Sequence, residues 1–211
     1  MTLKSPWLAL VLVAAHSLVH AGDRLAVGCQ TVALVLDDGL TPHALDRLWA
    51  SGDPAPGTPA VLQLRGCHGA LLDSITLEAP LARLDHALLR GAHVPTVLVT
   101  VDLTAPAGSY SGLLTRPIQV MGNRLAPAQA RAAGGQWQPI VLAHTGKAAW
   151  KRVRVGAAEQ LLSVRSEPQE GHFATRYRRY MQTKQGWAVR VRTQPGLWEA
   201  DGDFPSRRSF P

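Results

Sequence analysis

Cysteine and long hydrophobic runs are both scarce in this sequence. Two cysteines in 211 residues are too few for a small scaffold held together by several disulfides. The one apolar stretch lies close to the N-terminus, and the mean hydropathy is -0.01, which argues against a polytopic membrane protein. Hydrophobic residues make up 46% of the chain and charged residues 18%. A chain of this length and composition buries a real core, so it is neither disordered nor fibrous and forms one globular domain or two small ones.

The N-terminus has the parts of a secretory signal peptide. Lys4 supplies the positive charge, residues 8–15 form an apolar core, and Val19 and Ala21 place small side chains at the positions that signal peptidase reads. We therefore expect a signal peptide over residues 1–21, a periplasmic or secreted protein, and no transmembrane segment after signal removal. An uncleaved membrane anchor is the alternative, but the apolar run over residues 7–19 is too short to span about 30 Å of hydrocarbon.

The two cysteines, Cys29 and Cys67, form the only possible internal pair. Export to an oxidising compartment favours a disulfide between them, and closing the loop from 29 to 67 stabilises by about 4 kcal/mol in the chain-entropy model. An alternative makes Cys29 a lipidated N-terminus, because residues 26–29 loosely match a lipoprotein cleavage box. Asp23 and Arg24 oppose lipidation, because a lipoprotein signal is still apolar at that point.

Charge is distributed unevenly about Pro106. Residues 22–105 carry five Arg and nine Asp or Glu, a net charge of −4, whereas residues 106–211 carry sixteen Lys or Arg and six Asp or Glu, a net charge of +10. Four of the six tryptophans and every tyrosine and phenylalanine lie in the second part. We therefore expect an acidic subdomain over residues 22–105 and a basic, aromatic-rich β subdomain over residues 106–211 with a proline-rich tail.

The acidic half is expected to form a small mixed sheet with two helices. One helix is predicted after Thr41, which caps it before Pro42, and a second over residues 81–91, where leucines recur at helical spacing before Gly91. The basic half is expected to be antiparallel β-rich, so the fold class is α+β. The predicted strands cover residues 31–36, 61–64, 71–77, 94–103, 118–121, 140–143 and 150–155.

The clearest predicted element is a hairpin with arms over residues 173–181 and 187–193. In its second arm apolar residues alternate with Ala188, Arg190 and Arg192, so one face is apolar and the other cationic. The three large aromatic residues of the tail predict that it folds back over the end of this sheet. Arginines among aromatic rings favour binding to carboxylates, phosphates or sugars. The candidate binding residues are Arg176, Tyr177, Arg178, Arg179, Tyr180, Trp187, Arg190 and Arg192.

A second candidate site follows the strand over residues 32–36. This strand ends in Asp37-Asp38-Gly39, which resembles the first motif of the polysaccharide deacetylase family. The resemblance implies that Asp37 is the catalytic base and Asp38 a metal ligand, with the metal polarising an acetamide and activating water. The family's second motif, two histidines at i and i+4, is absent from this chain, so the sequence predicts no metal site beyond this alternative. A strand that ends in an Asp-Gly turn accounts for the same residues.

Converging acid, base and nucleophile candidates are otherwise missing, which favours binding over catalysis. We expect an exported binding protein of the inhibitor, immunity or envelope-accessory type, without a cofactor. Its expected partner is an acidic protein or an anionic envelope polymer, and export argues against nucleic acid. The alternatives are a metal-dependent carbohydrate hydrolase centred on Asp37 and Asp38, and a structural envelope component without a specific ligand.

Overall fold

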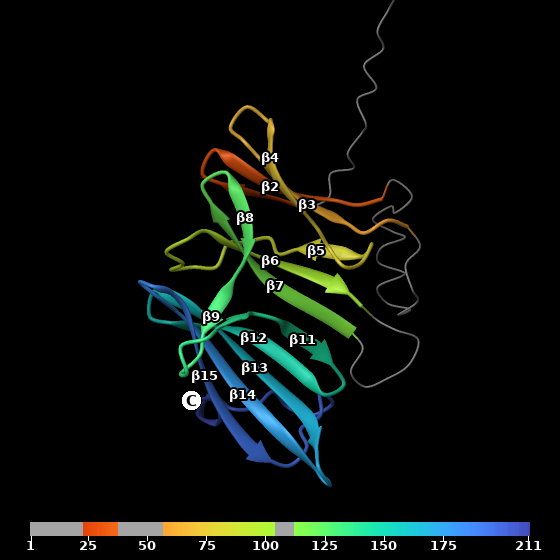
Figure 1. Cartoon of the computed structure of the whole chain (residues 1–211), viewed down its shortest axis with the longest axis vertical. Helices are drawn as coiled ribbons and strands as arrows, with labels where there is room; N and C mark the ends of the chain where they lie inside the picture. The colour runs from red at the N-terminus through yellow and green to blue at the C-terminus, as the bar shows by residue number, and fades with distance from the viewer. Residues whose placement is uncertain (1–22, 38–56, 104–111) are drawn as a thin grey trace, which may run out of the picture.

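The computed structural model describes residues 23–37, 57–103 and 112–211, which form β-strands in two sheets (Figure 1). The smaller sheet has four antiparallel strands in the order β1-β2-β3-β4. They are β1 (Arg24–Val27), β2 (Gln30–Val35), β3 (Val61–Arg65) and β4 (Leu71–Thr76). Cys29 and Cys67 form the expected disulfide, which joins the β1–β2 turn to the β3–β4 turn across 38 positions.

The larger sheet runs in the order β10-β9-β15-β14-β13-β12-β11-β7-β6-β5, and β8 pairs with β7 outside this path. Neighbours are antiparallel except β15 and β9, which are parallel. β6 precedes Pro106 and β7 follows it, so the sheet continues across the boundary between the acidic and basic halves. The strands are β5 (Ala82–Leu84), β6 (Thr96–Asp102), β7 (Gly112–Met121), β8 (Arg124–Pro127), β9 (Gln129–Arg131), β10 (Trp137–Pro139), β11 (Leu142–Thr145), β12 (Ala148–Val155), β13 (Ala158–Gln169), β14 (His172–Thr183) and β15 (Gly186–Pro195).

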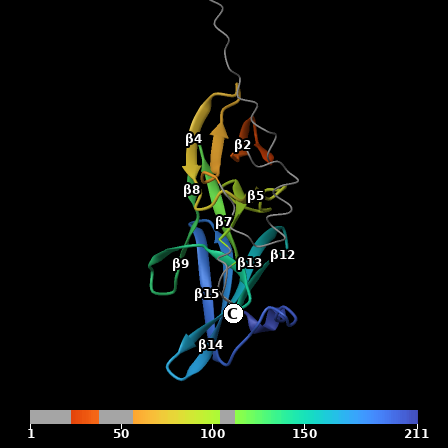
Figure 2. The same ribbon diagram turned by 90° about the vertical axis from the view of Figure 1, so that its right-hand side faces the viewer.

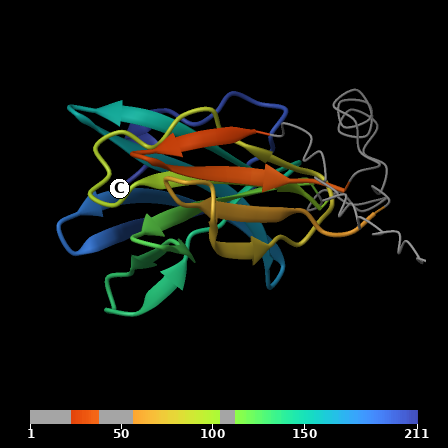
Figure 3. The same ribbon diagram turned by 90° about the horizontal axis from the view of Figure 1, so that it is seen from above.

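The small sheet packs against the end of the large sheet that contains β5 to β8, as the view from above shows (Figure 3). Side chains alternate between the two faces of a strand, so Val32 and Leu34 of β2 point the same way and are at most 1% exposed. They share a core with Val97 and Val99 of β6 and Ile118 of β7. Burial of these β-branched and leucine side chains holds the two sheets together.

Among the long strands β12 to β15, β13 is buried on both faces over its central residues. Leu161 of β13 lies in a core with Tyr180 and Trp187, whereas the next residue, Leu162, lies in a separate core with Phe210 from the C-terminal tail. The tail therefore covers one face of these strands, as the turned view also shows (Figure 2), and the predicted fold-back of the aromatic tail is confirmed.

The expected α+β class is wrong, because the described residues contain no α-helix and only one short 3₁₀ turn, η1 (Arg207–Ser209). The predicted helix over residues 81–91 is instead the strand β5 followed by irregular backbone. Strand pairing overrides the helical leucine spacing: β5 pairs with β6, and Leu84 packs in the core beneath the small sheet while Leu89 packs in the core with Trp187. The predicted helix after Thr41 lies outside the described residues.

The strand predictions are largely confirmed. Residues 31–36, 61–64, 71–77 and 94–103 correspond to β2, β3, β4 and β6, and the hairpin is β14 with β15. Residues 118–121 are the end of β7, and β11 begins at Leu142, two residues later than expected. No helix in the described segments is long and apolar enough to cross a membrane.

Candidate functional site

The hairpin of β14 and β15 carries all eight candidate binding residues, but its register divides them between two faces. Residues directly opposite each other on paired strands point to the same side of the sheet. Arg179 lies opposite Arg190, and Tyr177 lies opposite Arg192. The other face carries the two remaining arginines, Arg176 and Arg178, and the rings of Tyr180 and Trp187.

The face that carries Arg178 is mostly structural. Tyr180 is 6% exposed and Trp187 is 2% exposed, so neither ring is free to stack on a ligand at the surface. Burial raises the pKa of the Tyr180 hydroxyl, and the nearby charge of Arg178 opposes that shift. Arg176 forms an ion pair with Glu167 at 2.9 Å. This side of the hairpin therefore contributes core packing and a local ion pair.

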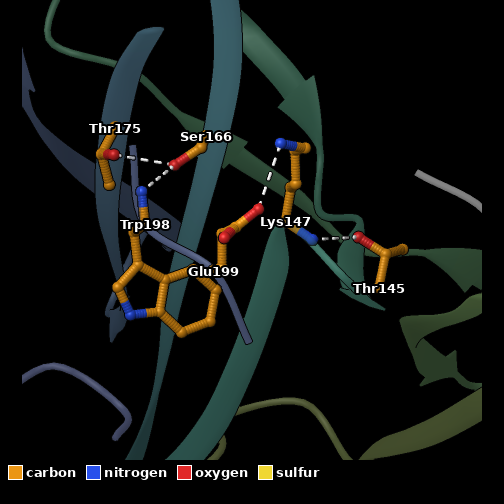
Figure 4. A network of polar contacts seen from close by, with 6 residues as sticks. All are labelled: Thr145, Lys147, Ser166, Thr175, Trp198 and Glu199. Atoms are coloured by element: carbon orange, nitrogen blue, oxygen red, sulfur yellow. Dashed lines mark hydrogen bonds and ion pairs between the residues drawn. The ribbon is translucent and has the colours of Figure 1, made fainter. Parts of the chain in front are cut away.

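The opposite face is partly covered by the tail, which a chain of hydrogen bonds anchors (Figure 4). The backbone N–H of Trp198 donates to Ser166 Oγ at 2.8 Å, and Ser166 Oγ lies 2.8 Å from Thr175 Oγ1. Thr175 Oγ1 in turn donates to the carbonyl of Gly196 at 2.8 Å. Further along the tail, Glu199 pairs with Lys147 at 3.4 Å. Polar groups on β13 and β14 thus determine where the tail lies.

The aromatic residues of the tail complete the packing on this face. The ring of Phe210 stacks on Phe204 with centroids 5.6 Å apart and meets Tyr177 edge-on at 5.5 Å. Lys151 Nζ lies 4.4 Å from the centroid of the Phe204 ring. Tyr177 is therefore a packing residue beneath the tail.

Docking of the tail brings together four arginines, Arg179, Arg190, Arg192 and Arg207, which we name the arginine cluster. Arg179 and Arg190 are opposite each other on the hairpin, and Arg207 comes from η1 in the tail. Burial lowers the pKa of the Arg179 guanidinium, and the positive charges of Arg207 and Arg190 lower it further. The guanidinium groups of Arg190 and Arg207 are thus the nearby like charges of Arg179.

Oxygen atoms of a side-chain amide and of the main chain accept hydrogen bonds from some of the guanidinium N–H groups of the cluster. Arg179 Nε donates to Gln160 Oε1 at 2.8 Å, and Arg192 Nη2 donates to the carbonyl of Arg208 at 2.8 Å. The Nε of Arg192 is buried without a hydrogen-bond partner. No Asp or Glu in the described segments forms an ion pair with any of the four guanidinium groups.

Arg207 is the cluster member that was absent from the candidate binding residues. It lies 15 positions beyond Arg192 in a segment whose acidic residues and prolines gave no β pattern. The only signal in the sequence was its pairing with Arg208 beside Phe210, in a tail expected to fold back.

The alternative site at Asp37 is described only in part. Asp37 Oδ2 accepts hydrogen bonds from the backbone N–H of Thr58 at 3.0 Å and from its hydroxyl at 3.1 Å. Asp38 lies outside the described residues. Within residues 23–37, 57–103 and 112–211, no three or more His, Cys, Asp and Glu side chains gather where they would hold a metal ion.

The cluster is thus a concentration of positive charge without an Asp or Glu partner in the described segments, built from two strands and the tail, although Arg179 Nη1 also donates to the carbonyl of Pro211 at 3.4 Å. Such a surface has the chemistry to hold a partner with several carboxylate, phosphate or sulfate groups. No protein-family model, curated protein or solved structure matches this chain.

Proposed function

We propose that this chain is an exported binding protein that holds an anionic polymer through the arginine cluster. The Cys29–Cys67 disulfide supports the exported location, because such bonds persist mainly in oxidising compartments. The net charge of +10 over residues 106–211 favours an anionic partner. The single observation that carries the proposal is the convergence of Arg179, Arg190 and Arg207 without an acidic partner in the described segments.

Repulsion within the cluster makes anion binding favourable. Arg179 is charged but partly desolvated, and its neighbours Arg190 and Arg207 lower its pKa. A bound carboxylate or phosphate would relieve this repulsion and supply acceptors for guanidinium N–H groups. Arg190 and Arg207 are both exposed, so their side chains reach a partner without rearrangement of the sheet.

A polymer fits this surface better than an acidic protein does. Protein interfaces usually have an apolar centre surrounded by a polar rim. Val191 lies on the face opposite the cluster, whereas Trp137 shares the face of the cluster but belongs to β10, which β9 separates from the hairpin, and Leu197 lies in the tail. No exposed large hydrophobic residue of β14 or β15 lies on the face that carries the cluster. A polymer with regularly spaced negative groups needs no apolar centre, because its binding is mainly electrostatic.

The experiment compares the wild-type chain with the double variant Arg190→Glu/Arg207→Glu. Binding is measured by calorimetry to dextran sulfate, to uncharged dextran and to poly-glutamate at low and high salt. The matched control is Arg154→Glu/Arg178→Glu, which makes the same change in net charge on the other face of the sheet. Circular dichroism and the unfolding midpoint confirm that each variant is folded.

We expect wild type and control to bind dextran sulfate, with an affinity at least roughly tenfold lower at high salt. The cluster variant should lose this binding. Dextran should not bind. Preference for poly-glutamate would assign the cluster to an acidic protein instead. Equal loss in both double variants would mean that overall charge, not the cluster, governs binding and would overturn the proposal.

A further inference from the structure

A separate pocket lies where β9 and β15 meet in the parallel part of the large sheet. Its volume is about 360 Å³, which is within the range of small-ligand sites. The turn between β14 and β15 forms one side of it, and β9 and β10 form the other. The residues that line it include Arg131, Trp137, Thr183, Lys184, Gln185 and Trp187. None of these residues belongs to the arginine cluster.

Trp137 presents an aromatic surface at the rim of this pocket. Its side chain is 51% exposed, which is unusual for the largest apolar residue. Gly186, with a φ of +112°, lies against the ring, since a Cβ at that position would be 3.5 Å from Cη2 of the indole. Backbone from the β14–β15 turn therefore supports the back of the ring, and part of the indole remains open.

Two positive charges lie beside this ring. Arg131 of β9 and Lys184 of the turn both line the pocket and are exposed, and neither forms an ion pair with an acidic residue of the described segments. The Thr183 hydroxyl already donates to the carbonyl of Gly186 at 2.8 Å. The pocket thus has cations free for a ligand and no competing carboxylate on its lining.

Trp187 lies beneath the pocket. It is 2% exposed, and the strand register places its side chain on the other face of the sheet from Trp137 and Arg131, in the core with Leu161 and Tyr180. The indole of Trp187 is therefore close enough to report on the pocket but is not a surface for a ligand.

We propose that this pocket binds a pyranose sugar that carries a carboxylate, that is, a hexuronic acid unit. The flat C–H face of the sugar would lie on the exposed indole of Trp137, while the carboxylate would bind Arg131 and Lys184. The hydroxyl groups would accept and donate hydrogen bonds to Gln185 in the β14–β15 turn. The proposal does not depend on the arginine cluster, because the two sites share no residue.

The test follows the indole N–H signals of the full mature chain by ¹⁵N NMR during titration with glucuronate. Parallel titrations use glucose, which lacks the charge, and acetate, which lacks the ring. The signals of Trp137 and Trp187 are assigned from Trp137→Phe and Trp187→Phe spectra. We expect saturable shifts of both signals with glucuronate, at least about tenfold weaker affinity for glucose, and no saturation with acetate.

Three variants separate this site from general charge and from folding. Trp137→Ala and Lys184→Ala should each weaken glucuronate binding about tenfold, whereas Trp137→Phe should retain most of it. Arg154→Ala is the control, because this exposed cation on β12 donates a hydrogen bond to the carbonyl of Gly156 and does not line the pocket. All of these changes are at exposed positions, so the far-ultraviolet spectrum should not alter. Glucuronate titrations that move neither signal, or that are unaffected by Trp137→Ala, would overturn the proposal. Failure of the arginine cluster to bind dextran sulfate would not, because dextran sulfate contains no uronic acid.

Discussion

The carboxylate of Asp73 on β4 accepts a hydrogen bond from the backbone N–H of Leu125 on β8 at 2.7 Å, which links the small sheet to the large one. The other carboxylate oxygen accepts from the backbone N–H of Ser74 at 2.8 Å. These two backbone hydrogen bonds, the one from Leu125 first, hold the pKa of Asp73 below its usual value of 3.8. The contact therefore depends on the charged form of the side chain.

Protonation of Asp73 should weaken the junction between the sheets. Because the folded-state pKa is depressed, the stabilisation is present above the unfolded-state pKa and is lost as pH falls through the folded-state pKa. We expect Asp73→Ala to lower the unfolding temperature near neutral pH. In acid the difference in unfolding temperature between the variant and wild type should be smaller. Thermal unfolding of both proteins from about pH 7 to about pH 2 tests this. Asp201→Ala, at an exposed tail position, is the control, and a penalty for Asp73→Ala that stays constant across this range would contradict the prediction.

Gly91 is required where the loop after β5 touches β13. It has a φ of +70°, and a Cβ there would lie 2.6 Å from Cα of Ala158. We expect Gly91→Ala to lower the free energy of unfolding by about 3 kcal/mol, because left-handed strain and a backbone clash add together. Gly28→Ala is the matched control: Gly28 has a φ of +63° but open space around it, so only about 1 kcal/mol is expected. If urea denaturation gives the same loss of unfolding free energy for Gly91→Ala and Gly28→Ala, the contact with Ala158 is unimportant.

Phe210 should hold the tail on the hairpin. Its ring is 6% exposed and contacts both Phe204 and Tyr177. We expect Phe210→Ala to cost about 3 kcal/mol and Phe204→Ala less, because Phe204 is only partly buried. Limited proteolysis should then cut the tail of the Phe210 variant faster than that of wild type. An unchanged cleavage rate together with unchanged stability would mean that Phe210 does not anchor the tail.

Local patterns in the sequence were enough to predict most of the strands that flank turns. The alternation in residues 187–193 and the apolar run over residues 31–36 both predicted strands that the structure contains. The long strand β13 was not predicted, because Leu161 and Leu162 are consecutive apolar residues and the residues from 163 to 167 do not alternate between apolar and polar. A strand buried on both faces has no simple period of two, so its pattern resembles that of a loop or a helix segment.

The candidate site was predicted only in part for a related reason. The sequence identified the arginines of the hairpin, but β14 has arginines at three of four successive positions from 176 to 179, which necessarily point to both faces. Which of the two faces is structural follows from packing: Tyr180 is buried, and Glu167 pairs with Arg176. Neither contact is apparent from the hairpin sequence alone.

The sequence by itself determined the pairing of Cys29 with Cys67, the unequal charge of the two halves and the alternation within the β14–β15 hairpin, because each depends on composition or on neighbouring residues. Only the tertiary structure decided that residues 81–91 contain a strand, that Arg207 joins Arg179 and Arg190, and that Trp137 lies beside Lys184. These outcomes require strand pairing, docking of the tail and the parallel contact of β9 with β15. They bring together residues distant in the chain, and a local pattern carries no information about which distant surface will cover it.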